Sequence, residues 1–291
     1  MKRFEKPPSG GAGRAFPALC LVISIILIFA LAGSSGRSVF ISAFDSFPPS
    51  SPSFAEASAD PAEEKTPPDP LMLEADRLLK RFGVKVVFGE SVMRSLGAYR
   101  IEPAIDGERI SAALAEVGRV LAMFPDGFFL RLTGGGIRGL RIELSGGVAG
   151  APPPLGLTGT DGDFRVIVLS VNAEPAVIRA TLAHELCHVI DLRLDCLAAS
   201  DPSHWNGEDW LALCPPGFAY GEGSPAYTAE EARPGDVWFI NRSAKASPYE
   251  DRAEIFEALM LLGPDSPIIK SPHIAAKLRY CLEAVKYYLI K

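Results

Sequence analysis

Apolar and polar positions follow two different periods along this chain, and together they predict a mixed α and β structure. Apolar side chains recur three or four residues apart from Leu71 to Phe82 and from Asp106 to Met123, as on one face of a helix. Short apolar runs bounded by Gly and Pro predict strands. These runs are Val84–Phe88, Phe128–Leu132, Leu140–Leu144 and Phe164–Val171.

The segment after the last of these runs, Glu174 to about Leu192, is predicted to form a helix with two different sides. At about 100° per residue, His184 and His188 fall in one narrow arc, and Asp191 lies between them one turn on. The opposite side is apolar and consists of Ile178, Leu182, Leu186, Val189 and Ile190. We therefore expect a helix that buries its apolar side and presents two imidazoles and a carboxylate on the other.

His184, Glu185 and His188 form the pattern H-E-x-x-H. Two His at positions i and i+4 of a helix can bind one Zn²⁺, and the Glu between them can take a proton from a water at the metal. Such a pattern also arises by chance on surface helices. Here the chain has only four His, two of them in this motif, and a predicted strand comes directly before the helix. Both features favour a metal site.

The first 70 residues differ from the rest of the chain. Residues 1–15 are basic, and residues 16–32 are apolar apart from Ser24. This is typical of a signal peptide or an N-terminal membrane anchor over residues 1–33, and both interpretations stay open. The basic flank predicts an exported chain, anchored in the membrane or secreted if the signal is cleaved. Residues 34–70, rich in Ser, Pro and Ala, predict a disordered linker. The folded domain is expected over residues 71–291.

Composition narrows the choice of partner and of redox chemistry. The chain of 291 residues has a net charge of -6, which argues against nucleic acid. It has no C-x-x-C pair, so a structural zinc knuckle is not expected. Outside the cytoplasm, Cys196 and Cys214 could form a disulfide. Cys187 and Cys281 could form a second disulfide or could be two buried thiols, and the sequence does not decide between these alternatives.

A long irregular stretch, Asp195 to Asn241, follows the H-E-x-x-H helix and holds Trp205, Trp210 and Trp238. A loop of this length in a compact domain is usually functional or disordered. Its aromatic side chains could line a substrate groove or could pack as an extension of the core, and the second role is the commoner one for any single aromatic residue.

A third metal ligand is expected in the helix that Ser247 opens. Ser247 fits the N-cap position, and Glu250 fits the capping-box carboxylate, a role that alone would explain it. Glu254 lies one turn later on the same face. A zinc site with two His needs a third protein ligand, so one Glu could bind the metal and the other could hold a ligand His by its far ring nitrogen. Asp191 is a rival ligand, but it scarcely reaches the same ion and fits a supporting or packing role better.

The motif H-E-L-C-H, followed downstream by E-D-R-A-E-I-F, resembles a family of bacterial zinc-binding metallopeptidases. These are akin to the catalytic domain of anthrax lethal factor, within the Glu-zincin group. The resemblance covers roughly residues 71–291, and the run Trp210–Tyr220 also resembles the middle segment of that family. It implies a zincin-like α+β domain with a small mixed β-sheet and an active-site helix. It further implies Zn²⁺ as cofactor, Glu250 as third ligand and Glu254 as a supporting residue.

The chain departs from the family pattern at one position. The family often has a Tyr seven residues before the ligand Glu, where its hydroxyl can stabilise the oxyanion, and this chain has Ser243 there. Oxyanion stabilisation or substrate contact would then fall to Tyr249, Tyr220 or Tyr227, or would be weak. Losing one such donor typically costs about a hundredfold or more in rate.

The sequence thus predicts a zinc metallopeptidase that acts on peptide or protein substrates outside the cytoplasm. His184, His188 and Glu250 would hold the metal, and Glu185 would be the general base. Two alternatives stay open. One is a catalytically silent binding or structural protein of the same fold, tethered to the membrane, which Ser243 favours and Glu185 disfavours. The other is a cell-wall peptide hydrolase, which shares the chemistry and differs only in substrate.

Overall fold

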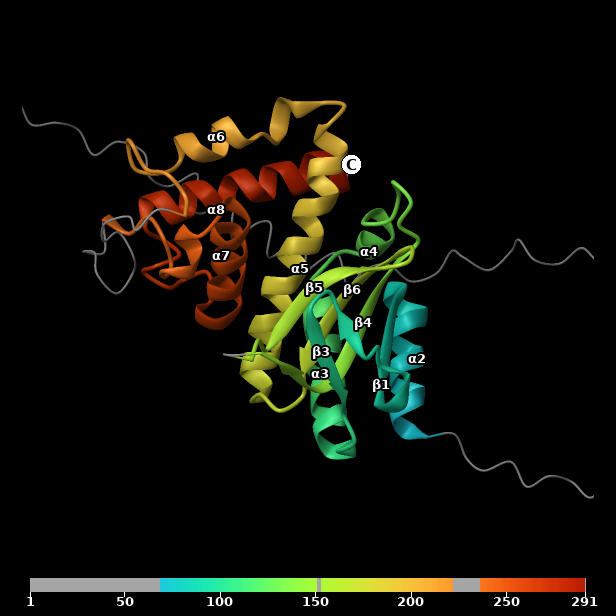
Figure 1. Cartoon of the computed structure of the whole chain (residues 1–291). Helices are drawn as coiled ribbons and strands as arrows, with labels where there is room; N and C mark the ends of the chain where they lie inside the picture. Colours follow the sequence, from blue (N-terminus) through green and yellow to red (C-terminus); the bar gives the residue numbers. More distant parts are fainter. Residues whose placement is uncertain (1–68, 151–152, 222–235, 291) are drawn as a thin grey trace, which may run out of the picture.

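The computed structural model describes residues 69–150, 153–221 and 236–290 of the chain (Figure 1). The predicted signal or anchor segment, nearly all of the predicted linker, and Tyr227 lie outside these residues. Among the described helices, none is both long enough and apolar enough to cross a membrane.

A six-stranded mixed sheet forms one half of the described structure (Figure 1). Its strands are β1 (Val84–Phe88), β2 (Ser95–Leu96), β3 (Tyr99–Pro103), β4 (Gly139–Ala149), β5 (Gly156–Asp161) and β6 (Phe164–Ser170). The order is β2-β3-β4-β6-β5, and β1 also pairs with β4. The long strand β4 is parallel to β1 and β6 and antiparallel to β3, while β5 is antiparallel to β6 at one end of the sheet.

Both faces of the sheet are buried, as the apolar run of β6 illustrates. Ile167 and Leu169 belong to the main core, whereas Val166 and Val168 belong to a second, smaller cluster. Neighbouring residues of a strand point to opposite faces, so a strand covered on both faces is apolar throughout. The helices α2 (Pro70–Phe82), α3 (Gly107–Leu121) and α5 (Pro175–Ala198) contribute to the main core.

The C-terminal helices lie on the other side of α5 from the sheet (Figure 1). They are α6 (Gly207–Ala212), α7 (Pro248–Leu262) and α8 (Pro272–Val285), with a terminal π-helix, η5 (Lys286–Ile290). Single 3-10 turns are η1 (Gly89–Ser91), η2 (Pro202–His204) and η4 (Ser243–Lys245). Because α5 is covered on both sides, Cys187 and Asp191 are buried although they do not belong to its predicted apolar side. The expectation of one buried side was therefore too narrow.

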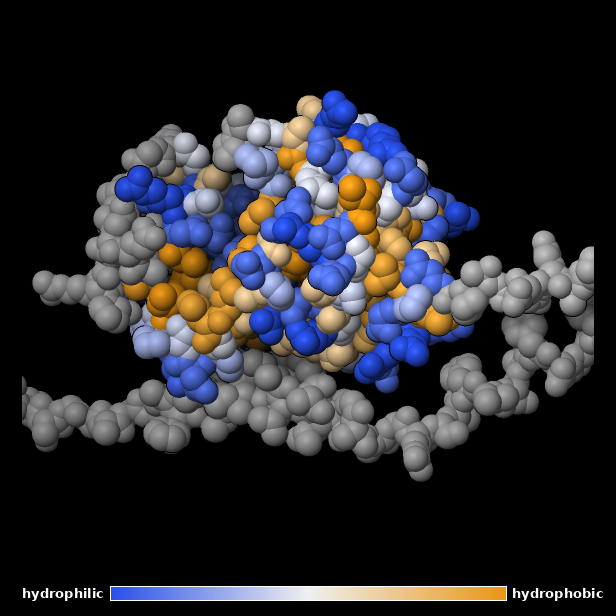
Figure 2. Space-filling view, turned by 90° about the horizontal axis from the view of Figure 1, so that it is seen from below, coloured by the Kyte–Doolittle hydropathy of each residue, from blue (hydrophilic) through white to orange (hydrophobic). Residues whose placement is uncertain are grey.

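The outer surface mixes hydrophilic and hydrophobic residues. Figure 2, which views the molecule from below, shows the two kinds interspersed over most of this face, with apolar side chains gathered on one side of it. Two of the exposed large apolar residues of the described chain, Leu261 and Leu262, close helix α7.

The structure confirms the α+β class and most of the predicted elements, but one predicted strand is wrong. Phe128–Leu132 forms a short helix, α4 (Phe128–Arg131), which begins after Gly127 in a left-handed conformation. Phe128 and Phe129 pack edge to face on each other, and both also pack on Phe124. This compact aromatic cluster outweighs the strand preference of the individual residues. The three glycines from Gly134 form a turn, in which Gly134 bridges to Ile137.

The long stretch is partly helical, and the structure decides between the alternatives for its tryptophans and for the cysteines. Helix α5 continues into the stretch, and α6 lies within it. Trp205 and Trp210 are buried in the main core, so they pack as core residues. The four cysteines of the described chain are free thiols, so the disulfide considered for Cys196 and Cys214 is absent. Cys187 and Cys281 are the two buried thiols that were the open alternative.

Candidate metal centre

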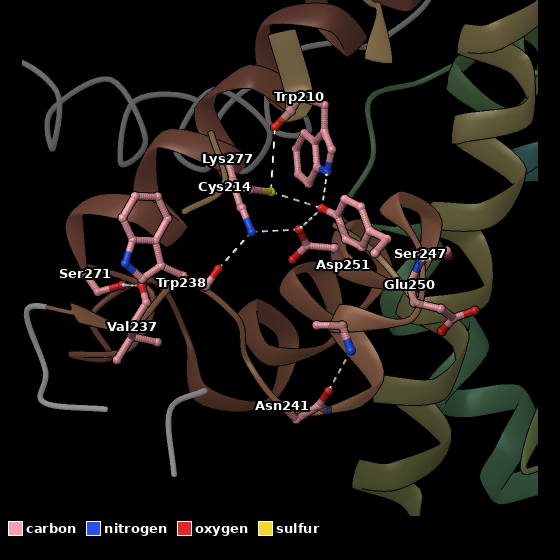
Figure 3. A network of polar contacts seen from close by, with 12 residues as sticks. Trp210, Cys214, Val237, Trp238, Asn241, Ser247, Glu250, Asp251, Ser271 and Lys277 are labelled. Carbon is pink, nitrogen blue, oxygen red and sulfur yellow. Dashed lines mark hydrogen bonds and ion pairs between the residues drawn. The ribbon is translucent and has the colours of Figure 1, made fainter. Parts of the chain in front are cut away.

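The local structure at the start of α7 turns Glu250 toward α5. The Ser247 side chain accepts a hydrogen bond from the main-chain N–H of Glu250 at 3.2 Å, which confirms the predicted N-cap. The carboxylate of Glu250 is not used in the cap and points toward α5, while Asp251 points the other way (Figure 3). Glu250 thus takes part in the cap through its backbone N–H only, and its side chain is free to contact α5.

His184, His188 and Glu250 come together between α5 and α7. Nε2 of His184 lies 3.4 Å from one Glu250 carboxylate oxygen, and Nε2 of His188 lies 3.6 Å from the other. The three ligand atoms lie within 4.8 Å of one another. In a tetrahedral zinc site with bonds of about 2.0–2.1 Å, ligand atoms are about 3.3–3.5 Å apart. The donor types fit Zn²⁺, and the distances of the two His from Glu250 are close to this spacing, with one coordination position left for water.

The cluster carries an excess of acidic groups. The carboxylates of Glu185, Glu250, Glu254 and Glu257 all act on His184. Burial lowers the pKa of His184, but its contacts with Glu250 and Glu257 outweigh burial and raise the pKa to about 10. Burial and the neighbouring charge of His184 lower the pKa of His188 to about 4. Opposite shifts of this kind arise where two imidazoles share one carboxylate, and a divalent cation would neutralise the surplus negative charge.

Glu257 is a functional candidate that sequence reasoning missed. Its carboxylate lies 3.1 Å from Nδ1 of His184, the ring nitrogen that faces away from Glu250. The family resemblance implied this supporting role for Glu254, but Glu254 instead accepts a hydrogen bond from Asn241 at 2.6 Å. Glu254 still lies close enough to His184 and Glu257 to form a second ligand group with them. The spacing of 250, 254 and 257 on one helix face was the available signal.

Glu185 is buried beside the two His and is held from strand β5. Its carboxylate accepts a hydrogen bond from the Thr158 hydroxyl at 2.7 Å. Burial raises the pKa of Glu185 to about 7, although Thr158 and the charge of His184 act in the opposite direction. A general base works best with a pKa near the working pH. Thr158 was not expected from the sequence.

These groups line one cavity of about 550 Å³. Its walls come from β5, from α5 and from the start of α7. The lining residues are Gly156, Leu157, Thr158, His184, Glu185, His188, Leu192, Ser247, Tyr249 and Glu250. Ligands, base and an open volume therefore share one place in the fold.

Two of the rival residues have other partners. Asp191 forms a buried ion pair with Nε of Arg252 at 2.5 Å, which is the packing role and not the ligand role. Burial raises the pKa of Asp191 to about 7, against the opposing effect of Arg252. The Tyr220 hydroxyl donates to Asp251 at 2.6 Å and does not line the cavity. The suggestion that Tyr220 contacts substrate or oxyanion is therefore corrected.

Ser243 and Tyr249 differ in their relation to the cavity. Ser243 begins the 3-10 turn η4 before α7 and is not among the lining residues. Tyr249 does line the cavity, but its hydroxyl donates to Asp195 at 2.8 Å. A tyrosine hydroxyl that points to the metal ligands is thus not seen in the described part of the chain.

A buried polar network holds α7 on the side away from Glu250 (Figure 3). Lys277, which has no exposed surface, donates to Asp251 at 2.6 Å and to the carbonyl of Trp238 at 2.8 Å. Tyr220 adds a second donor to Asp251, and Cys214 lies 3.3 Å from the Tyr220 hydroxyl. Burial raises the pKa of Asp251, although the Lys277 charge opposes that shift.

The first turn of α7 is fixed from several directions at once. The contacts beside Glu250 are those of Tyr249 with Asp195, Asp251 with Lys277 and Arg252 with Asp191. Consecutive helical residues point about 100° apart, so these contacts surround the helix axis. Rotation of α7 would break all of them, which keeps the Glu250 carboxylate directed at the two His.

Comparison with protein-family models, with curated proteins and with solved structures found no match to this chain. Two imidazoles and one carboxylate can hold a divalent metal, and a further buried carboxylate lies where it can move a proton.

Proposed function

We propose that this protein is a zinc-dependent peptidase that hydrolyses peptide bonds outside the cytoplasm. One observation carries the proposal: His184, His188 and Glu250 offer three ligand atoms within 4.8 Å of one another, and Glu185 lines the same cavity. Metal storage alone would need no general base in that position. The basic and apolar N-terminal residues support export.

The side chains have separate roles in the proposed reaction. When bound, the metal supplies Lewis acidity, which activates a water and polarises the scissile carbonyl. His184, His188 and Glu250 would hold it. Glu185 takes a proton from the attacking water and delivers it to the leaving amine. Glu257 accepts from Nδ1 of His184 and so directs the other ring nitrogen into the site.

Strand β5 supports a peptide as the substrate. It ends the described sheet and pairs with β6 alone, so its other edge has backbone groups available for a further strand. Gly156, Leu157 and Thr158 of this strand line the cavity. An extended peptide that adds to such an edge gains main-chain hydrogen bonds. It would carry a carbonyl past Glu185 and the two His.

A second candidate is a metal-binding protein without turnover. It is favoured by the lack of an evident oxyanion donor among the described candidates, because Ser243 does not line the cavity and the Tyr249 hydroxyl is bonded to Asp195. Such a protein would hold zinc through the same three ligands.

The test compares wild type with Glu185→Gln, and uses Glu283→Gln, at an exposed helical glutamate, as the matched control. We expect wild type and control to hydrolyse a fluorogenic peptide library, and Glu185→Gln to lose roughly a hundredfold or more in kcat while keeping its zinc. Hydrolysis that survives in Glu185→Gln would contradict the assigned role. Bound zinc without hydrolysis in wild type would favour the second candidate.

A further inference from the structure

Thr158 makes two contacts with Glu185 across the gap between strand β5 and helix α5. Its hydroxyl lies 2.7 Å from a carboxylate oxygen of Glu185 and 3.1 Å from the main-chain carbonyl of the same residue. Glu185 is nearly fully buried, and Thr158 is the residue that supplies a hydrogen bond to its carboxylate. The side chain and backbone of the base are thus both held by one residue of the edge strand.

The neighbouring Gly156 shows how closely β5 approaches the base. A Cβ at Gly156 would lie 2.8 Å from a carboxylate oxygen of Glu185 and 2.6 Å from a methyl carbon of Thr181. Ordinary contacts to a Cβ exceed about 3.4 Å, so any larger residue would push the strand or Glu185 aside. Gly156 and Thr158 point to the same face because strand residues alternate. Gly156 leaves room for the Glu185 carboxylate, and Thr158 donates a hydrogen bond to it.

The chemistry of a hydroxyl suits this position. A threonine hydroxyl has one hydrogen to donate and two lone pairs to accept. It can donate to the ionised carboxylate at the shorter distance, a charge-assisted hydrogen bond. It can instead turn toward the main-chain carbonyl of Glu185, which also lies within hydrogen-bond distance. Either orientation of the hydroxyl keeps Thr158 bonded to Glu185.

We propose that Thr158 is a positioning residue that seats the Glu185 carboxylate at the wall of the metal cavity and so ties the base to edge strand β5. The proposal rests on the proposed peptidase function. Since an extended substrate would pair with β5, the strand that receives the peptide is also the strand that orients the base.

The test uses Thr158→Val, which keeps the shape and removes the hydroxyl, and Thr158→Ser, which keeps the hydroxyl. Thr160→Val is the matched control, because Thr160 lies two residues further on the same strand and bonds to Arg165 instead of α5. We expect Thr158→Val to lower kcat roughly tenfold to a hundredfold with little change in KM. Thr158→Ser should recover most of the rate, and Thr160→Val should match wild type. All variants should bind zinc as wild type does.

A readout independent of turnover comes from thermal unfolding of the zinc-saturated chain. We expect Thr158→Val to lower the midpoint by roughly 3–6 °C in wild type, and by clearly less when Glu185 is already Ala. An equal shift in both backgrounds would overturn the proposal, as would a non-additive shift with unchanged kcat. If the wild-type chain cleaves nothing yet shows the non-additive shift, the peptidase function fails and the contact is structural only.

Discussion

At the scale of single residues, two side chains near the site could each have had either of two roles, and the structure shows one contact for each. Glu250 stands where a capping-box carboxylate belongs, but only its backbone N–H takes part in the cap. Its side chain faces the two His. Asp191 lies one turn beyond His188, but Arg252 holds it at 2.5 Å as a buried ion pair. In each case the partner across the helix interface decides the role.

Glu257 provides the first prediction at this scale. Glu257→Gln removes the charge that faces Nδ1 of His184 and keeps the size of the side chain. Loss of a group that orients a ligand typically weakens metal affinity roughly 10–100-fold. Competition with a chromophoric chelator would measure it. Glu254→Gln is the control, because Glu254 bonds to Asn241, and a larger loss in the control would contradict the assignment.

Site residues that belong to a motif within one helix could be predicted from the sequence. Site residues that depend on a contact between two packed elements could not. His184, Glu185 and His188 lie in one short segment, and Ser247 with Glu250 in another. Thr158 reaches Glu185 only because β5 packs on α5, and its surroundings are too rich in Gly to signal a strand. Glu257 needs the packing of α7 on α5.

At the scale of elements, helix α7 matters because its first turn carries one proposed metal ligand and is held in place by several contacts. The network around Asp251 fastens it toward α8, and the ion pair of Arg252 fastens it toward α5. Arg252 also lies over the rings of Trp205, at 4.7 Å, and Tyr249, at 4.9 Å. A ligand carried on a rigid element is held in place before the metal arrives.

Lys277→Met provides the prediction at this scale. The substitution leaves Asp251 as a buried charge without its cation, because both side chains are fully buried. Breaking a buried pair on one side costs about 3–5 kcal/mol of unfolding free energy. Urea unfolding would measure it, with Arg77→Met at the exposed Arg77–Glu74 pair as the control. A loss in Lys277→Met no larger than in the control would show that the network does not fasten α7.

Elements with a regular spacing of apolar residues could be predicted from the sequence, and short strands without such a spacing could not. The spacing of apolar residues identified α2, α3, β1 and β6 nearly to their ends. Strands β2, β3 and β5 were missed, because two to six residues with Gly or charged residues give no clear alternation. The double burial of α5 was also hidden, because a helix pattern does not reveal how many layers will cover it.

At the scale of the whole molecule, the candidate site lies where the sheet half meets the C-terminal helices. The His residues come from α5, Glu250 comes from α7, and the base is seated by β5. Helix α7 is far in sequence from α5 and β5. A bound metal would link α7 to α5, and a ligand that binds only the folded state raises its stability. The central claim is therefore that one metal site joins α5 to the C-terminal helix α7.

Bound zinc per chain in wild type, Glu250→Gln and Glu254→Gln tests that claim most directly. Both glutamates lie one turn apart on the same face of α7, so the pair is matched in position and chemistry. We predict about one zinc in wild type and in Glu254→Gln, and far less in Glu250→Gln. Equal zinc in Glu250→Gln, or no zinc in wild type, would contradict the three-ligand site and the peptidase built on it.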